Sequence, residues 1–100
     1  MAINLPYNIP VNVKVIGKNA DDTKERTITN LNVHASSSSV TSEATQDPMV
    51  WRITNKSATV NGISALNATA TNELGTNIAG TVDINQMPAD PATHLVITEA

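Results

Sequence analysis

The stretch I-N-L-P-Y-N-I-P-V-N-V-K-V, residues 3–15, alternates apolar and polar or prolyl residues over its whole length. Its apolar members occupy the odd positions from Ile3 to Val15. Because successive side chains of a β-strand point to opposite faces, a period of two predicts a strand with one buried face. This stretch therefore favours an all-β fold.

The same period recurs along the chain and predicts further strands. After Gly17, the charge-rich segment 18–26 is typical of a solvated hairpin loop. In the strand predicted at 27–34, the inward positions slip near Asn30, which indicates a β-bulge. The remaining strands are predicted at 49–54, 57–60, 64–74, 78–86 and 93–99.

Two connections carry their own signals. Residues 35–46 contain four consecutive serines and little apolar mass, so they bury too little to offset their ordering entropy and are predicted to form a mobile loop. Asn61-Gly62 predicts a tight hairpin turn, because both residues tolerate a positive φ.

About seven strands in 100 residues predict an antiparallel β-sandwich, with a small barrel as the alternative. The length is that of a single domain. We expect residues 1–10 to form an N-terminal arm or edge strand and residues 11–100 to form one sandwich.

The composition shows how the core must be built. Hydrophobic residues make up 40% of the chain, yet there is one Trp, one Tyr and no Phe. Trp51 shares a strand face with Ile53, so it is expected to supply much of the core. The alternative is an exposed Trp51 that stacks on sugars.

Two segments in the second half resemble a known family. They are V-W-R-I-T-N-K-S-A-T-V-N-G-I, residues 50–63, and E-L-G-T-N-I-A-G-T-V, residues 73–82. Together they resemble bacterial immunoglobulin-like domains of the group-2 type. The matching positions are Trp51, Asn55, Ala58, Thr59, Val60, Gly62, Gly75, Thr76 and Ile78. The resemblance implies an immunoglobulin-like sandwich without catalysis, as found in surface adhesins and on tailed-phage virion proteins.

Few residues could carry chemistry. The chain has no Cys, which excludes disulfides, thiolate catalysis and cysteine-bound zinc. His34 and His94 are expected at the surface, without a catalytic partner. The aspartates form no calcium-loop pattern, and the glycines form no phosphate-binding loop. We therefore expect no catalytic residue, no metal site and no cofactor. The candidate aspartates are Asp21, Asp22, Asp47, Asp83 and Asp90.

Charge and hydropathy limit the partners. The net charge is −3, with six dispersed Lys and Arg, so no basic face is expected for nucleic acid. No apolar run approaches the roughly 20 residues of a membrane-spanning helix. The first ten residues lack the basic leader and apolar stretch of a signal peptide. The expected location is a virion assembled in the host cytoplasm.

The N-terminal arm is the predicted contact element. Pro6 and Pro10 both lie at even positions, so they remove hydrogen-bond donors from one strand edge only. Such a strand could add to a partner. Alternatively, it is an edge strand that bends at Pro10 to move between sheets. The predicted partner-binding residues are Ile3, Leu5, Tyr7 and Ile9.

The function expected from these features is that of a non-enzymatic structural protein of a phage virion, as a capsid decoration or tail-associated domain. Its partner would be a capsid or tail subunit or a second copy of the chain, which leaves a homo-oligomer open. The alternative is an adhesive or carbohydrate-binding module of a bacterial surface protein. A small enzyme lacks residues to carry it.

Overall fold

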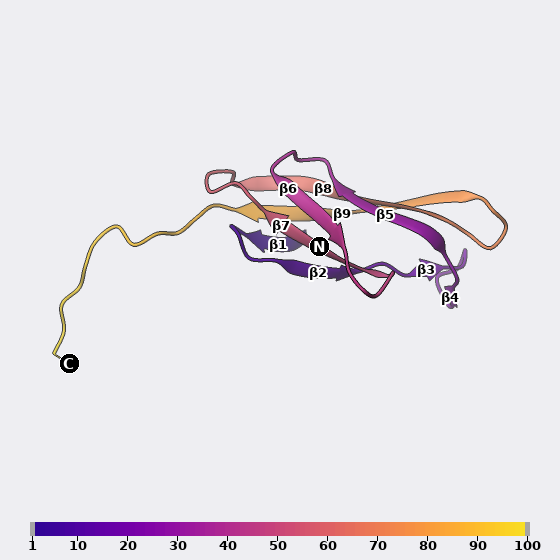
Figure 1. Ribbon diagram of the computed structural model, residues 1–100, viewed down its shortest axis with the longest axis horizontal. Helices are drawn as coiled ribbons and strands as arrows, with labels where there is room; N and C mark the ends of the chain where they lie inside the picture. The colour runs from indigo at the N-terminus through magenta and orange to yellow at the C-terminus, as the bar shows by residue number, and fades with distance from the viewer. Residues whose placement is uncertain (1, 100) are drawn as a thin grey trace.

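The computed structural model describes residues 2–99, and in this range the chain forms nine β-strands and no helix (Figure 1). The molecule is elongated, with extents of 64 × 29 × 26 Å. The strands are β1 (Ala2–Pro6), β2 (Val11–Lys14), β3 (Gly17–Lys18), β4 (Glu25–Arg26), β5 (Thr29–Ala35), β6 (Val40–Ala44), β7 (Val50–Asn55), β8 (Gly62–Thr71) and β9 (Asn77–Met87).

Seven of the strands form two sheets, and β3 pairs with β4 in a separate ribbon. One sheet has the order β1-β9-β8-β5 and the other the order β2-β7-β6. Strands β5-β8-β9 and β2-β7-β6 correspond to the C-F-G and B-E-D orders of the immunoglobulin fold. The expected immunoglobulin-like β-sandwich of about seven strands is confirmed, and the barrel alternative is wrong. One pairing is not antiparallel, because β1 runs parallel to β9.

The core lies between the sheets and is almost entirely aliphatic. It contains Leu5, Val13, Val33, Val40, Ile53, Leu66 and Ile84. Trp51 is half-buried and packs against this cluster, whereas its strand neighbour Ile53 is fully buried. Trp51 therefore contributes to the core from its periphery, which is less than the sequence predicted.

The long alternation of residues 3–15 is divided between the two sheets. β1 lies beside β9, while β2 lies beside β7 in the opposite sheet. Residues 7–10 cross between them, with Asn8 at a φ of 59°. Within this crossing, Tyr7 forms an isolated parallel β-bridge with Asn55 of β7. The alternation continues across the crossing because both strands direct their odd-numbered side chains toward the same core.

Two local predictions are confirmed. The β5–β8 register shifts between Thr29 and Asn32, which marks the bulge, and Asn30 within it has a left-handed φ of 55°. The charge-rich segment forms the β3–β4 ribbon with an exposed loop at 19–24.

The prediction of a mobile loop at 35–46 is wrong, because residues 40–44 form strand β6. Val40 is buried in the core, and β6 pairs with β7 along its whole length. The Ser42 hydroxyl also donates a 2.6 Å hydrogen bond to the Val33 carbonyl of β5. One buried valine and these hydrogen bonds order a segment that its composition presents as a loop.

The predicted strand at 57–60 and the Asn61-Gly62 hairpin are also wrong. Residues 56–61 form a loop in which the Ser57 hydroxyl accepts hydrogen bonds from the amides of Thr59 and Val60. Asn61 has no positive φ, so it makes no turn of the predicted type, and Gly62 begins β8. Local serine hydrogen bonding competes here with strand formation.

The strand predicted at 93–99 does not form. Residues 88–99 leave the sandwich as an extended segment, which we call the tail (Figure 1). The edge of β9 where the tail begins is occupied by β1, so the tail has no adjacent place in its own sheet.

Candidate interaction surfaces

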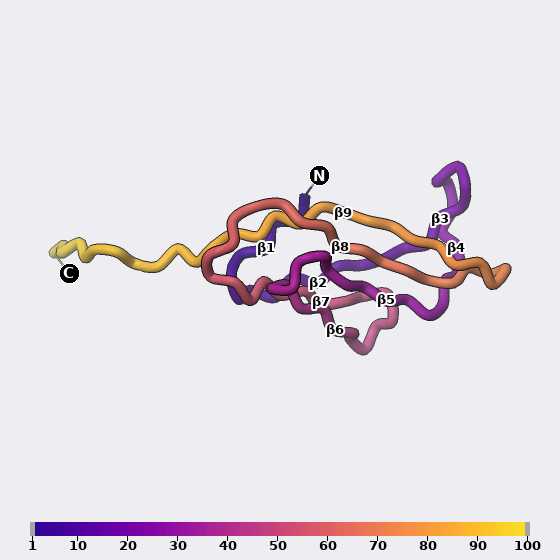
Figure 2. Tube along the Cα trace, turned by 90° about the horizontal axis from the view of Figure 1, so that it is seen from above, coloured from indigo at the N-terminus to yellow at the C-terminus, as the bar shows by residue number. Residues whose placement is uncertain are grey.

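The candidate surfaces lie at opposite ends of the sandwich. One end, which we call the tail end, carries the crossing 7–10, the loop 56–61 and the tail. The other, the groove end, carries the β3–β4 ribbon and the β8–β9 hairpin tip. The view turned by 90° shows the same separation (Figure 2).

A buried amide pair joins the two sheets at the tail end. Asn55 of β7 and Gln86 of β9 are both almost completely buried. The Gln86 amide nitrogen donates to the Asn55 side-chain oxygen over 3.0 Å and to the Ser39 hydroxyl over 2.9 Å. The Gln86 oxygen lies 3.4 Å from the Ser64 hydroxyl, which donates to it. The pair thus connects β7, β8, β9 and the loop before β6.

The remaining hydrogen bonds of the Asn55 side chain are made with backbone groups of neighbouring segments. Its amide nitrogen donates to the carbonyls of Leu5 and Met87, at 3.3 and 3.2 Å, and its oxygen accepts from the Ser57 amide. No buried side-chain nitrogen or oxygen among the described residues lacks a partner. Since a buried amide without partners would be costly, this network fixes β1, β9 and the loop 56–61 against one another.

The root of the tail is tied to this arrangement. The Ala89 amide donates a 2.8 Å hydrogen bond to the Ala58 carbonyl, and the Asn8 amide donates to the Asn55 carbonyl over the same distance. Beyond Ala89, residues 90–99 are exposed. The tail therefore starts from a rigid position and then projects into solvent.

Of the four predicted partner-binding residues, two are exposed, one is partly buried and one is completely buried. Leu5 is completely buried, and Ile3 packs against the core. Tyr7 and Ile9 lie on the crossing at the tail end and are exposed. Partner binding at Tyr7 and Ile9 stays a prediction, whereas the structure uses the side chains of Leu5 and Ile3 inside its own sandwich.

The tail carries the two most exposed large aliphatic side chains of the described residues, Leu95 and Ile97, with Val96 between them. Leu95, Val96 and Ile97 are 90%, 76% and 96% exposed. Three consecutive aliphatic residues in solvent cost free energy that their burial against a partner would recover. Sequence periodicity pointed to a strand here, and the structure leaves that strand unpaired.

An apolar groove opens at the groove end. A cavity of about 300 Å³ lies between the β2–β3 connection and the β8–β9 hairpin. Its apolar lining includes Val15, Ile16, Ile28, Leu31 and Ile78. A neighbouring hollow continues from Ile28 and Ile78 to Leu74 at the hairpin tip. We call this continuous depression the groove.

The edge of β9 beside the groove is free. β1 pairs with β9 only from Asp83 to Met87, so residues 77–82 pair with β8 alone within the described part of the chain. A free strand edge presents unpaired backbone groups to a further strand. The sequence did not reveal this edge, because it depends on where β1 ends relative to β9.

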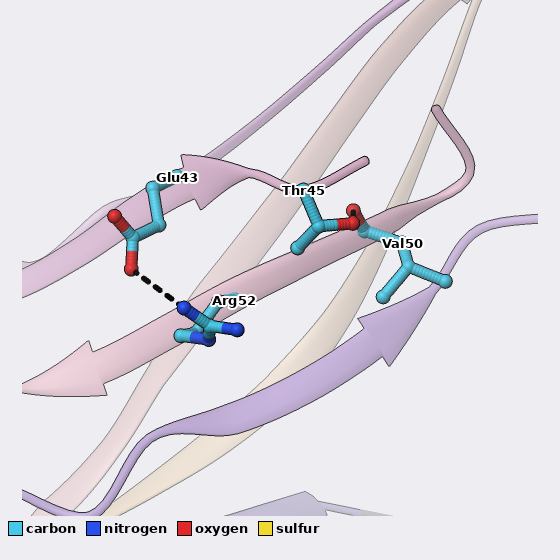
Figure 3. Close-up of polar contacts among 4 residues, drawn as sticks. All are labelled: Glu43, Thr45, Val50 and Arg52. Atoms are coloured by element: carbon cyan, nitrogen blue, oxygen red, sulfur yellow. Dashed lines mark hydrogen bonds and ion pairs between the residues drawn. The ribbon is translucent and has the colours of Figure 1, made fainter. Parts of the chain in front are cut away.

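The ion pair of the described residues lies on the sandwich surface. The Arg52 guanidinium lies 3.6 Å from the Glu43 carboxylate across β6 and β7, and both side chains are largely exposed (Figure 3). The nearby Thr45 hydroxyl donates to the Val50 carbonyl over 2.7 Å (Figure 3). Within residues 2–99, no three His, Asp or Glu side chains lie close enough together to hold a metal ion. This part of the chain also has no helix that could span a membrane.

The histidines and aspartates that the sequence analysis considered as catalytic or metal-binding candidates lie on the surface and form no common site. His34 and His94 are both exposed, on β5 and in the tail. Asp21 is fully exposed in the ribbon loop, where hydrogen bonds from the Thr23 hydroxyl and amide lower the pKa of its carboxyl. These bonds order the loop without creating a ligand site.

Comparisons with known proteins support the fold alone. No protein-family model matches the sequence, and no curated protein does. Among solved structures, the chain is similar to the solution structure of the PKD domain from the KIAA 1837 protein. The TM-score is 0.60 at 11% sequence identity, covering 93% of this chain and 87% of that one. The chain thus has an immunoglobulin-like fold.

Proposed function

We propose that the chain is a non-enzymatic structural module of a phage virion that acts through protein–protein contacts. The group-2 type of bacterial immunoglobulin-like domain, suggested by residues 50–63 and 73–82, is part of this proposal. Its partner is a capsid or tail subunit, or a second copy of the chain.

The observation that carries the proposal is the exposed aliphatic tail. Leu95 to Ile97 extend from an anchored root at Ala89 and contact no part of the sandwich core. Contiguous exposed apolar surface is typical of protein–protein contact sites. The fold adds support, because its interior is filled by aliphatic side chains and the satisfied amide pair of Asn55 and Gln86.

The proposal is tested by rate-zonal sedimentation of lysates from cells that make the particle. We expect the wild-type chain to sediment with particles far larger than 10.5 kDa. The double variant Leu95→Asp/Ile97→Asp should remain at the top of the gradient, because charged residues oppose burial of the tail.

The matched control is Ile63→Asp. Ile63 is an exposed aliphatic residue on the outer face of β8 and belongs neither to the tail nor to the lining of the groove at the other end. It should sediment like the wild type. A wild-type chain that stays free in every fraction, or an equal loss in the control, would contradict the proposal. Binding of the free chain to bacterial surface glycans would support the adhesive alternative instead.

A further inference from the structure

We propose that the tail of one copy of this chain docks in the groove of a second copy, as an added strand beside residues 77–82 of β9. This inference rests on the proposed function and names its partner, a second copy of the chain. The contact is heterologous, since different surfaces of the two copies meet.

Tail and groove are matched in length and chemistry. The free edge of β9 is six residues long, and the tail segment 93–98 offers a strand of the same length. Leu95 and Ile97 lie two apart, so in an added strand they point to one face. The apolar groove, lined by Val15, Ile16 and Ile78, lies next to this edge.

The direction of the chain supports head-to-tail docking. β9 runs from the groove end to the tail end, and the tail leaves the sandwich at that end (Figure 1). When copies are stacked along the long axis in the same orientation, the tail of one enters the groove end of the next. It then runs parallel to the acceptor β9, in line with the acceptor β1, which is itself parallel to β9.

The charges at the two surfaces are complementary. The tail carries Asp90 and Glu99 and no Lys or Arg. Three cationic and two acidic side chains line the groove and the hollow that adjoins it beside the β2–β3 connection. The cationic residues are Lys14, Lys18 and Arg26, and the acidic ones are Glu25 and Glu73. The acidic tail therefore meets a slightly cationic rim, which favours the tail over a basic segment as occupant.

Mixing two defective variants tests the inference. Leu95→Asp/Ile97→Asp removes the donor and leaves the groove, whereas Ile78→Asp disrupts the groove and leaves the tail. Ile16→Asp is the second groove variant, and both groove residues are partly exposed, so the sandwich should tolerate them. Thermal unfolding verifies that each variant is folded, and Ile63→Asp is the control.

Analytical ultracentrifugation should show a concentration-dependent series of oligomers for the wild type and the control. Each defective variant alone should be monomeric. An equimolar mixture of a tail variant and a groove variant should form a heterodimer and nothing larger, because only one intact donor and one intact acceptor remain.

Three results would overturn the inference: a wild type that stays monomeric up to about 1 mM, a mixture that stays monomeric, or a monomer whose tail amides are protected from exchange. These results are distinguishable from failure of the proposed function. A monomeric chain that still sediments with particles overturns only the tail–groove contact. A chain that self-associates but never joins a particle overturns only the virion assignment.

Discussion

Asn55 and Gln86 show how single residues fix the geometry of the tail end. Each amide is buried between the sheets, and each hydrogen-bonds to groups from the other side of the sandwich. The sequence did not predict this pair. Polar residues at strand ends are ordinarily exposed, and only the strand crossing at 7–10 places β1 over Asn55.

We predict that Asn55→Ala lowers the free energy of unfolding by about 2–3 kcal/mol, because it removes the side-chain hydrogen bonds to the Leu5 and Met87 carbonyls and one of the two acceptors of the Gln86 amide nitrogen. Urea unfolding measures the change. Asn85→Ala is the control, since Asn85 makes only a long, exposed contact with Asn4, and should cost less than about 0.5 kcal/mol. Equal costs for the two variants would contradict a structural role for the amide pair.

We predict that Leu5→Ala lowers the free energy of unfolding by about 3–5 kcal/mol, as expected for a fully buried leucine. Ile9→Ala, at an exposed site on the same arm, should change it by less than about 0.5 kcal/mol. Chemical denaturation compares them. A small effect of Leu5→Ala would mean that β1 is dispensable and free to pair with a partner, as the sequence first suggested.

At the scale of elements, the sequence predicts strands well where apolar residues alternate over many positions. β2, β8 and β9 follow this rule, and the slip at Asn30 gave the bulge in β5. It fails at β6, where pairing with β7 and one buried valine outweigh a serine-rich composition. It fails again at 93–99, where the alternation is real but the molecule supplies no neighbouring strand. The periodicity of a sequence shows which side chains a strand could bury, but it does not show whether a neighbouring strand is available to pair with it.

We predict that Gly17→Ala displaces the β3–β4 ribbon. A Cβ at Gly17 would lie 2.6 Å from Cγ2 of Ile28 and 2.7 Å from the Arg26 carbonyl oxygen. Because both contacts are too short, β3 must shift relative to β4 and Ile28. Hydrogen exchange of the ribbon amides should accelerate. Gly80→Ala is the control, because nothing lies within 4 Å of its Cβ. Unchanged exchange in Gly17→Ala would show that the ribbon is not seated on Ile28.

We predict that the ribbon loop loosens in acid. The pKa of Asp21 is lowered because the Thr23 hydroxyl and amide donate to its carboxylate. The ordering from these bonds is present above the ordinary Asp pKa and is lost as pH falls through the lowered one. The Thr23 amide chemical shift should titrate with a midpoint below the ordinary value, and Asp21→Ala should abolish that titration. A midpoint at or above the ordinary value would contradict the bonding.

At the scale of the whole molecule, the immunoglobulin-like architecture follows from the sequence, but its two ends do not. The all-β sandwich architecture and the aliphatic core can be inferred from periodicity and composition. The groove and the free edge of β9 arise because β1 is short and covers only the last part of β9. The projecting tail arises because β1 also occupies the edge at which the tail begins. These features depend on long-range register, which local patterns do not encode.

The central claim is that the tail is a free strand in the monomer and an added strand in the assembled chain. Hydrogen–deuterium exchange across a concentration series tests it most directly. At low concentration, amides 93–97 should exchange at the rate of an unfolded chain, while amides of β8 and β9 that pair with one another stay protected. As oligomers form, residues 93–97 and the free edge at 77–82 should gain protection together. Protection of 93–97 in the monomer, or a gain at 93–97 without one at 77–82, would contradict the account.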